Sequence, residues 1–446
     1  MSDALFTDLY ELTMMAGYVD AGCADIEATF DLFFRKPPGG VDLVVAAGLD
    51  PALDYLERLQ FTAEDLDYLR AEATLPARFL EWLRELRFTG DVWAIPEGTP
   101  VFQDEPLLRV TGPLAQAQLV ETALLNHICY HSLVASNALT ISRAANGKRI
   151  LEFGARRAHG PDGALSGARA AIIGGCAATS NVLAGQRFGV PVLGTQAHSW
   201  IMSFPREIEA FRAYARTFPE HCILLVDTYD TLATGLPNAL TLARELAQQG
   251  HRFGGIRLDS GDLAELAARA RRMLDEAGFA DASILASGDL DAASITALEA
   301  VGAPIDGYGV GTSLLTARSD PAFAGVYKLA EIDRRPVMKI SSSTEKMTSP
   351  GRKQVWREDA HDVIGLADEH RPGRPLLERV MASGRRLTEP VPLLELRQRC
   401  LAAAEEIAPK VQTGFKVRRS ARLEALRTRL LQEFRDSVAR GDSARQ

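Results

Sequence analysis

Six short apolar runs recur through the middle of the chain, and a stretch with helical spacing separates each run from the next. They span 150–154, 190–194, 222–227, 255–259, 283–287 and 307–311, so successive runs start 40, 32, 33, 28 and 24 residues apart. A strand, its covering helix and two loops need about 30 residues, so this rhythm predicts repeated βα units and a parallel sheet. Continuous apolar strands are typical of a sheet that is buried on both faces.

The segments on either side of this region read differently. Residues 25–120 and 326–410 contain short apolar runs broken by Gly and Pro, which predicts β-rich structure, and we expect them to pair as one domain. The α/β domain is predicted over 121–325. Residues 1–24 are predicted to form a helix that joins it, and residues 411–446 a basic C-terminal helix.

Composition excludes several classes of protein. The 446 residues are 46% hydrophobic and 24% charged, as in an average globular chain that is long enough for two or three domains. The net charge of −8 argues against general nucleic-acid binding. Residues 416–446 are the exception, with nine Lys or Arg and four Asp or Glu. Because apolar residues recur there at helical spacing, we interpret the charges as the solvated face of a helix, with nucleic-acid binding as the minor alternative.

Compartment is indicated by the cysteines and by the absence of targeting patterns. The five cysteines are scattered, and no two are spaced as C-x-x-C, which argues against a disulfide framework and a structural zinc site and favours the cytoplasm. The longest apolar window, 168–185, is interrupted by polar residues and falls short of the ~20 that a spanning helix needs. No signal peptide is visible at the N-terminus. We therefore expect no membrane association.

Polar, charged or glycine residues follow all six apolar runs. The carboxyl ends of parallel strands meet at one edge of a sheet, so these residues are predicted to form a single ligand site. In chain order they are Glu152, Arg156 and Arg157; Thr195 and His198; Asp227, Thr228 and Asp230; Arg257, Asp259 and Asp262; Ser287, Gly288 and Asp289; and Gly309, Gly311 and Thr312.

The arginines and glycines of this set favour an anionic, phosphate-bearing substrate. Arg156, Arg157 and Arg257 carry the planar fork that pairs with a carboxylate or phosphate, and the alternative is an ion pair with Glu152 or Asp259. The segment 309–312, Gly-Val-Gly-Thr, offers backbone N–H groups and a hydroxyl to a phosphate; the alternative is a tight turn.

The carboxylates and the histidine each have two interpretations. Ser-Gly-Asp-Leu occurs at 260–263 and again at 287–290, and its carboxylates, with Asp227 and Asp259, are candidates to support Mg²⁺ or a cationic transition state. Capping of a helix N-terminus explains the repeat equally well. His198 is a candidate general base, nucleophile or hydrogen-bond donor, or a structural side chain.

Seven blocks of this sequence, in order, resemble the nicotinate phosphoribosyltransferase family. They are LFTDLYELTM at 5–14, LEFGARRA at 151–158, GTQAHS at 194–199, LVDTYD at 225–230, IRLDSGDL at 256–263, GVGTS at 309–313, and the lysine-rich segment 339–353. The resemblance implies a type II phosphoribosyltransferase, with an irregular (β/α) TIM-like barrel and a second, open-faced β-sandwich domain. It also implies a homodimer with shared active sites.

The same resemblance implies an activity. Nicotinic acid and phosphoribosyl pyrophosphate would give nicotinate mononucleotide and pyrophosphate, with Mg²⁺ as cofactor and ATP hydrolysis coupled through a phosphohistidine. In that reading His198 is phosphorylated by ATP and Tyr10 stacks on the pyridine ring from the neighbouring subunit. Substrate contacts are then assigned as follows: Arg156, Thr195 and Arg257 bind nicotinate or a nearby phosphate, and Ser287, Gly288, Gly311 and Thr312 bind the phosphoribosyl group.

Three alternatives remain open at this stage. The first is a phosphoribosyltransferase of the same fold that acts on nicotinamide or quinolinate; the two arginines favour an acid over an amide. The second is an unrelated barrel enzyme such as an aldolase or isomerase, which usually needs a lysine or an acid/base pair at a strand end. None of the six strand ends carries a lysine. The third is a non-catalytic scaffold that uses the basic C-terminal segment.

Overall fold

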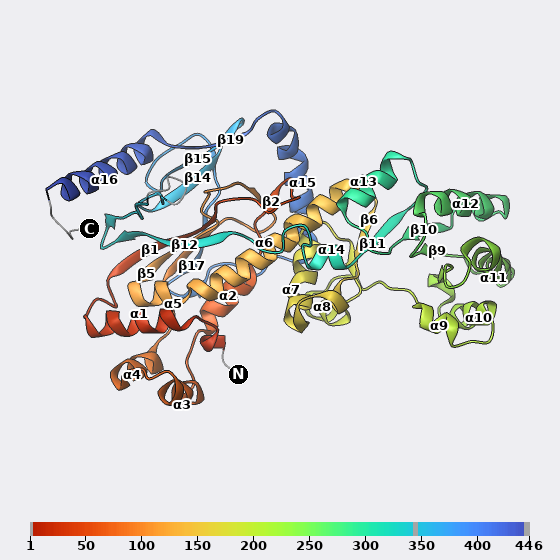
Figure 1. Cartoon of the computed structure of the whole chain (residues 1–446), viewed down its shortest axis with the longest axis horizontal. Helices are drawn as coiled ribbons and strands as arrows, with labels where there is room; N and C mark the ends of the chain where they lie inside the picture. Colours follow the sequence, from red (N-terminus) through yellow and green to blue (C-terminus); the bar gives the residue numbers. More distant parts are fainter. Residues whose placement is uncertain (1–2, 342–346, 441–446) are drawn as a thin grey trace. The chain divides into compact units, whose positions relative to one another are not determined.

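The computed structural model describes residues 3–341 and 347–440, and the chain divides into two compact units (Figure 1). The first unit comprises Met1–Leu133, Ala322–Pro392 and Arg399–Gln446, and the second comprises Val134–Pro321 and Leu393–Gln398. The first unit thus includes the N-terminal helix, which we expected to join the α/β domain. Each unit is described by itself below.

A seven-stranded antiparallel sheet forms the centre of the first unit, in the order β13-β12-β1-β5-β3-β17-β18. Strands from the two predicted β-rich segments pair within it: β1 with β12, and β3 with β17. The bounds are β1 Glu27–Phe34, β3 Asp91–Ala94, β5 Leu108–Pro113, β12 Gly325–Ile332, β13 Arg335–Pro336, β17 Glu378–Ala382 and β18 Arg385–Arg386.

Two smaller sheets complete the strands of this unit. One has the order β16-β14-β15-β19, with β19 parallel to β15, and the other pairs β2 with β4. The bounds are β2 Val44–Val45, β4 Pro100–Val101, β14 Lys353–Arg357, β15 His361–Leu366, β16 Arg374–Pro375 and β19 Lys416–Arg419.

The prediction of one basic helix over 411–446 was wrong. The helix α15, Leu393–Gln412, ends before Gly414, whose φ of +96° lies in the left-handed region. Residues 416–419 then extend as β19 beside β15, and a second helix, α16, begins at Ala421 and ends at Ala439. Hydrogen bonds to a strand that is distant in sequence outweigh the local helical pattern here.

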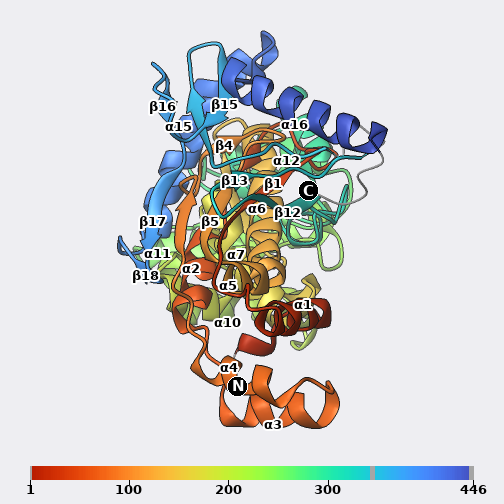
Figure 2. The ribbon, with the colours of Figure 1, turned by 90° about the vertical axis from the view of Figure 1, so that its left-hand side faces the viewer.

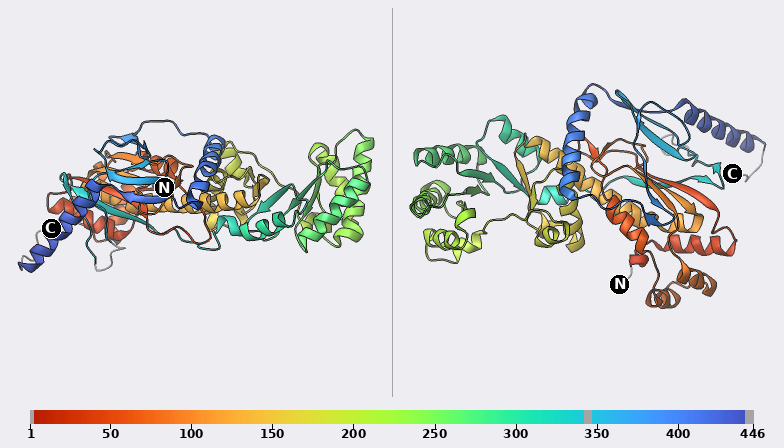
Figure 3. Two further views of the ribbon diagram at one scale, coloured as in Figure 1. Left: turned by 90° about the horizontal axis from the view of Figure 1, so that it is seen from above. Right: turned by 180° about the vertical axis from the view of Figure 1, so that it is seen from behind.

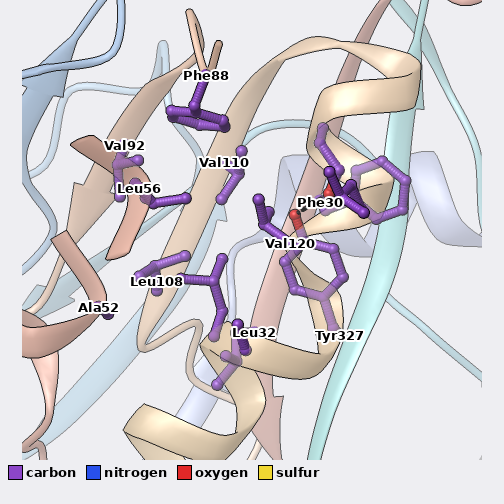
Figure 4. Close-up of a cluster of buried hydrophobic side chains, with 14 of the residues drawn as sticks. Phe30, Leu32, Ala52, Leu56, Phe88, Val92, Leu108, Val110, Val120 and Tyr327 are labelled. Atoms are coloured by element: carbon purple, nitrogen blue, oxygen red, sulfur yellow. Dashed lines mark hydrogen bonds between the residues drawn. The ribbon is translucent and has the colours of Figure 1, made fainter. Parts of the chain in front are cut away.

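The hydrophobic core of the first unit packs against the large sheet, and Figure 4 shows part of it. Phe30 on β1 stacks on Tyr327 of β12, with ring centroids 4.9 Å apart. The buried hydroxyl of Tyr327 donates to the carbonyl of Ala117 at 2.7 Å, so burying the ring leaves no unpaired polar group. Leu32 and Leu108, from the neighbouring strands β1 and β5, are fully buried in the same layer.

Helices of the first unit follow amphipathic patterns in the sequence. In α1 the residues Leu12, Met15 and Val19 recur at helical spacing and are buried. The helix packs against α5 and α4, and α4 lies beside α3 (Figure 2). The bounds are α1 Leu9–Asp20, α2 Leu49–Arg58, α3 Ala63–Glu72, α4 Ala77–Glu85 and α5 Leu114–Leu119; α6, Glu121–Ala144, continues into the second unit.

A six-stranded sheet forms the second unit, in the order β7-β6-β11-β10-β9-β8, and all its strand pairs are parallel. Five of the six predicted runs are strands, which confirms the βα rhythm. The bounds are β6 Arg149–Glu152, β7 Ala178–Thr179, β8 Ile223–Leu225, β9 Gly255–Leu258, β10 Ser283–Ala286 and β11 Gly307–Val310.

The strand predicted at 190–194 does not form. Val192 makes only an isolated parallel bridge to Thr179, and the neighbouring Pro191 has no N–H to donate to a ladder. The sixth strand is instead the short β7, which pairs with β6. The pairing of β6 with β11, the first and last long strands of the repeat, is typical of a barrel. In the described part of the chain, however, β7 and β8 remain as two free edges, so the sheet is not a closed barrel.

Helices of the second unit connect successive strands. The helix α11 packs against α10 and against α12, and α12 contacts β9 and β10 (Figure 3). The bounds are α7 Gly160–Ile173, α8 Val182–Phe188, α9 His198–Met202, α10 Glu207–Thr217, α11 Leu236–Gln248, α12 Leu263–Glu276, α13 Ala292–Ala300 and α14 Thr312–Leu315. Among the described residues, no helix combines the length and the apolar character that crossing a membrane requires.

Candidate active site

Arg257, on β9, lies at the centre of a cluster of predicted site residues in the second unit. Its Nε donates to Ser287 Oγ at 2.7 Å and its Nη1 to Thr195 Oγ1 at 3.0 Å. Its Nη2 lies 2.6 Å from Asp259 Oδ1, an ion pair with both side chains largely buried. The predicted alternative for this arginine, an ion pair with Asp259, is therefore formed. Because the ends of β9 and β10 and the loop that carries Thr195 hold the guanidinium, its position is defined before any ligand arrives.

Two carboxylates belong to this cluster: Asp259, which pairs with the arginine, and Asp227, which contacts Asp259. Asp227 Oδ2, after β8, accepts from the backbone N–H of Asp259 at 2.9 Å and from Ser260 Oγ at 2.7 Å. Burial alone would raise the pKa of Asp259, but hydrogen bonds from Ser287 and Arg257 outweigh it and lower that pKa. Asp259 is therefore ionised at neutral pH.

His198, the first residue of α9, joins the cluster through both ring nitrogens. Its Nδ1 lies 3.1 Å from Thr228 Oγ1, and its Nε2 lies 3.8 Å from Asp259 Oδ2. The ring is only partly covered, since 42% of its side chain is exposed, so a reactant can reach it. A carboxylate on one side and a hydroxyl on the other fix the orientation of the ring.

A pocket of about 290 Å³ opens beside these groups, on one face of the parallel sheet. Phe153, Thr195, Arg257, Ser287 and Gly309 are among its lining residues. The Arg257 guanidinium lies 5.6 Å from the centroid of the Phe153 ring. The pocket thus combines an aromatic wall with a cation, a pairing that suits a small aromatic anion.

The glycines at the strand ends are required by close packing. A Cβ on Gly288, whose φ is +100°, would lie 2.0 Å from the carbonyl oxygen of Asp259. A Cβ on Gly309 would meet the Phe153 ring at 2.6 Å, and one on Gly311 would meet the Phe153 carbonyl oxygen at 2.9 Å. Packing therefore explains these residues without a ligand, although it also leaves backbone groups open to one.

Other predicted residues do not join the cluster. Glu152 is fully buried, and its Oε2 accepts from Thr179 Oγ1 at 2.5 Å, so the predicted ion pair with Arg156 or Arg157 is not formed. Both arginines are exposed in the turn η2, Ala155–Arg157, and neither guanidinium has an ion-pair partner within residues 3–341 and 347–440. Two free cations remain near the end of β6.

The repeated Ser-Gly-Asp-Leu segments have different roles. Asp262 caps α12 by accepting from the N–H of Glu265 at 3.0 Å, as the capping interpretation predicts. Asp289 does not cap α13, because Asp291 does so; its carboxylate instead lies 3.2 Å from Arg318 and is exposed. Thr312 begins the short helix α14 after Gly311, with no side-chain contact to Arg257 among the described residues.

Tyr10 belongs to the first unit and lies on α1. It is 49% exposed, and its neighbours Phe6 and Leu9 are 46% and 58% exposed. Burial, followed by the side chain of Glu11, raises the pKa of Tyr10, so its hydroxyl stays protonated at neutral pH. Three adjacent exposed apolar side chains form a surface of the kind that packs against a partner.

Comparison with known proteins decides the family. The sequence model described as the nicotinate phosphoribosyltransferase (NAPRTase) N-terminal domain matches residues 5–129, and that of the nicotinate phosphoribosyltransferase (NAPRTase) family matches residues 148–364. The chain belongs to the nicotinate phosphoribosyltransferase family. The resemblance found in the sequence is thereby confirmed.

Relatives in this family cover most of the chain. A nicotinate phosphoribosyltransferase of Mycobacterium tuberculosis is 44% identical over 424 residues, covering 92% of this chain and 90% of that protein. One from Bacillus subtilis is 49% identical over 374 residues, covering 83% and 75%. The crystal structure of human nicotinic acid phosphoribosyltransferase is similar, with a TM-score of 0.84, 32% identity and coverage of 94% and 99%.

The sequence of this family member assigned no role to two residues of the site. Phe153 provides the aromatic wall, and the only signal was its place directly after Glu152 at a strand end. Thr228 was recognised as a strand-end residue but received no role, and it contacts His198. Their significance depends on side chains about 100 and 30 residues away in sequence, which no local pattern reports.

Proposed function

We propose that this protein is a nicotinate phosphoribosyltransferase, which converts nicotinic acid and phosphoribosyl pyrophosphate into nicotinate mononucleotide and pyrophosphate in NAD salvage. Membership of the family supports the proposal. The single structural observation that carries it is the Arg257 cluster: a guanidinium held by Thr195, Ser287 and Asp259 beside an aromatic wall. Such a site suits a flat aromatic carboxylate next to a phosphorylated sugar.

The reaction needs positioning and charge stabilisation more than proton transfer. The pyridine nitrogen already carries a lone pair, so it attacks C1 of the ribose without a general base. As the bond from C1 to the pyrophosphate oxygen breaks, positive charge develops on the sugar and negative charge on the leaving group. Arg257 would hold the nicotinate carboxylate or a nearby phosphate, and Arg156, Ser287, Gly288, Gly311 and Thr312 are assigned to the substrate's anionic groups.

Magnesium is the cofactor that we expect with a pyrophosphate leaving group. It prefers oxygen ligands and is commonly bound by one or two carboxylates together with substrate phosphates. Asp227 Oδ1 is buried and has no hydrogen-bond partner in the described part of the chain, so the donor set fits. Asp227 and Asp259 would hold the ion, which would neutralise charge on the departing pyrophosphate. Asp289 is a weaker candidate, since Arg318 engages it.

ATP coupling through His198 is the second part of the proposal. A ring nitrogen of His198 would attack the γ-phosphorus of ATP, ADP would leave, and water would later release the phosphate. The carboxylate of Asp259, 3.8 Å from Nε2, would stabilise positive charge on the ring during transfer. The phosphorylated ring would add about −1.5 to −2 charge beside Arg257 and so alter how the site binds anions.

Product analysis tests the reaction. The purified protein is incubated with phosphoribosyl pyrophosphate and Mg²⁺ and with nicotinate, nicotinamide or quinolinate in turn, each with and without ATP. Of the three candidate substrates, we expect only nicotinate to give a product, nicotinate mononucleotide, and we expect ATP to make this reaction faster. Turnover of nicotinamide instead, or release of CO₂ from quinolinate without any effect of ATP, would refute the assignment in favour of the neighbouring activities.

Labelled ATP tests the phosphohistidine. The wild type is expected to take up an acid-labile phosphoryl label from γ-labelled ATP, and His198→Ala to take up none. His251→Ala is the matched control, because His251 belongs to the same unit and pairs with the exposed Glu220 at 2.7 Å. Label that survives in the His198 variant would rule out this residue as the acceptor.

A homodimer with shared sites, located in the cytoplasm, completes the proposal. The exposed Phe6, Leu9 and Tyr10 support an interface at α1, and Tyr10 would then stack on the pyridine ring in the partner's site. All five cysteines are free thiols, as suits a reducing compartment.

A further inference from the structure

The chain segments that carry His198 and Thr228 are joined at a second place, outside the pocket beside Arg257. His198 begins α9, which leads through 203–206 into α10. Thr228 follows β8, and its segment leads through the π-helical turn η4, Thr231–Gly235, into α11. Because α10 contacts both α9 and α11 (Figure 1), a residue that ties α10 to α11 can influence how the histidine meets Thr228.

Glu207, the first residue of α10, makes this second connection. Its Oε2 accepts a hydrogen bond at 2.8 Å from Nδ2 of Asn238, in the first turn of α11. Glu207 is only 6% exposed, and neither residue lines the pocket. A carboxylate stabilises a helix N-terminus from the surface as well, and burying it costs free energy. The burial of Glu207 therefore points to the contact with Asn238 as its role.

Trp200 fixes α9 to the same helix. Its Nε1 donates to the carbonyl of Ala210 at 3.3 Å, and its ring meets those of Phe204 and Tyr214 edge-on, with centroids 4.9 and 6.5 Å away. Trp200 lies in the same short helix as His198. The position of α10 therefore determines the position of the histidine.

On the other segment, the turn η4 is packed against the end of β8. A Cβ on Gly235 would lie 1.9 Å from the carbonyl oxygen of Val226, so the turn has no room to move inward. Asp230 caps the turn, since its Oδ1 accepts from two backbone N–H groups at 2.9 and 2.7 Å. Thr228 lies just before this cap, and its Oγ1 is 3.1 Å from Nδ1 of His198. π-Helical turns are rare and occur frequently at functional sites.

We propose that Glu207 is a positioning residue for His198. The contacts form a closed ring through α9, α10, α11 and η4 that begins and ends at this histidine. In this ring the hydrogen bond between Glu207 and Asn238 keeps the Thr228 hydroxyl on Nδ1, so that Nε2 is left to attack the γ-phosphorus of ATP. The inference rests on the proposed phosphorylation of His198 and adds to it a residue outside the pocket.

Uptake of label from γ-labelled ATP by the full-length protein tests the inference. Glu207→Ala should slow this uptake about tenfold, and Glu207→Gln should restore most of it, since the glutamine carbonyl can still accept from Asn238. Glu245→Ala is the matched control: it breaks the ion pair with Arg212 at 2.5 Å, which joins the same two helices near the other end of α11, and it should take up label like the wild type.

A double-mutant cycle with Thr228→Val separates positioning from a general loss of structure. Thr228→Val alone is expected to slow labelling about tenfold, and adding Glu207→Ala should slow it by less than about twofold more, because both changes remove the same contact of the histidine. Two unrelated structural defects would instead multiply to about a hundredfold. The inference is overturned by such a product, by Glu207→Ala that labels like the wild type, or by Glu245→Ala that labels as slowly as Glu207→Ala.

A measurement without ATP keeps the two proposals apart. Diethyl pyrocarbonate modifies a neutral histidine ring, and mass spectrometry gives the rate at His198. This rate should be about threefold higher in Glu207→Ala than in the wild type, because Nδ1 is released from Thr228, and unchanged in Glu245→Ala. A wild type that takes up no label would refute the phosphorylation of His198, whereas equal modification rates in Glu207→Ala and the wild type would refute the positioning role of Glu207.

Discussion

The guanidinium of Arg257 is held by a hydroxyl on each of two loops and by a carboxylate, and each contact uses a different nitrogen. A lysine cannot make three such contacts in one plane, so it would retain the charge and lose the geometry. Replacing Arg257 by lysine therefore separates the effect of the positioned guanidinium from the effect of its positive charge.

Arg257→Lys is expected to lower kcat/KM for nicotinate by about a hundredfold, because the substrate anion loses a fixed fork. The control is Arg271→Lys. Arg271 also makes three contacts, to Asp275 at 2.8 Å and to the carbonyls of Ala282 and Phe279 at 2.7 and 2.8 Å, but lies on α12 outside the pocket lining. Steady-state kinetics measure kcat/KM for nicotinate in both variants. An equal loss of kcat/KM in the two variants would show that Arg257 has only a structural role.

Glu11 provides a residue-scale prediction about stability. It is fully buried on α1, and its Oε2 accepts from Gln118 Nε2 at 2.8 Å. Burial, as the main cause, raises the pKa of Glu11 from 4.5 to about 7. Below pH 4.5 the folded and unfolded chains both carry the proton. Between pH 4.5 and 7 the unfolded chain loses it while the folded chain retains it, so the free energy of unfolding falls as the pH rises.

In Glu11→Gln this decline should disappear. The free energy of unfolding of the variant is expected to rise by about 3 kcal/mol relative to that of the wild type between pH 4.5 and pH 7. Urea unfolding at several pH values measures this difference. Glu81→Gln, at an exposed position of α4, is the control and should follow the wild type. Parallel pH profiles for wild type and Glu11→Gln would mean that Glu11 ionises normally in the folded state.

At the scale of elements, the turn after β10 determines how closely that strand end approaches β9. The N–H of Ser287 donates to the carbonyl of Leu258 at 2.8 Å, and Gly288 then passes next to the carbonyl of Asp259. The turn therefore aligns Ser287 and Asp259 around Arg257, and its glycine makes the close approach sterically possible.

Gly288→Ala is expected to destabilise the protein by about 2–4 kcal/mol and to reduce kcat strongly, because its Cβ would displace Asp259. Gly278→Ala isolates the backbone contribution: Gly278 also has a positive φ, of +89°, but no atom lies within 4 Å of its Cβ position. This control variant should have a free energy of unfolding about 1 kcal/mol below that of the wild type and an unchanged kcat. Thermal unfolding and turnover are measured for both. A Gly288 variant that behaves like the Gly278 variant would show that the strand ends tolerate displacement.

At the scale of the whole molecule, the candidate residues are divided between the two units. Tyr10 lies in the first unit and the Arg257 cluster in the second. The proposed homodimer accounts for this division if Tyr10 of one subunit completes the site of the other. Such an interface would cover the exposed apolar residues Phe6, Leu9 and Tyr10, which lie just before α1 and in its first turn.

Mixing two inactive variants tests that arrangement. Tyr10→Ala and Arg257→Ala are each expected to have low activity. If they are unfolded, mixed and refolded together, about a quarter of the wild-type activity should return, since half of the dimers are mixed and each contains one intact site. Arg257→Ala mixed with Ser287→Ala is the control and should remain inactive, because both residues act in the same subunit. A lack of recovery in the first mixture would show that Tyr10 serves its own subunit or none.

Local patterns in the sequence were sufficient to predict those features of this protein that depend on residues close to one another in the chain. The spacing of the apolar runs predicted β6, β8, β9, β10 and β11, because a strand buried on both faces needs continuous apolar residues. Parallel strands share one functional edge, so the same runs also indicated which polar residues would gather there, and Thr195, His198, Asp227, Arg257, Asp259 and Ser287 do.

Only the tertiary structure decided which partners these residues take. The sixth strand is at 178–179 and not at 190–194, and residues 416–419 extend beside β15, because ladder hydrogen bonds join segments far apart in the chain. Asp262 and Asp289 have nearly identical local sequences, yet one caps a helix and the other pairs with Arg318. Long-range contacts contribute as much free energy as local preferences do, so identical short sequences take different roles when their distant neighbours differ.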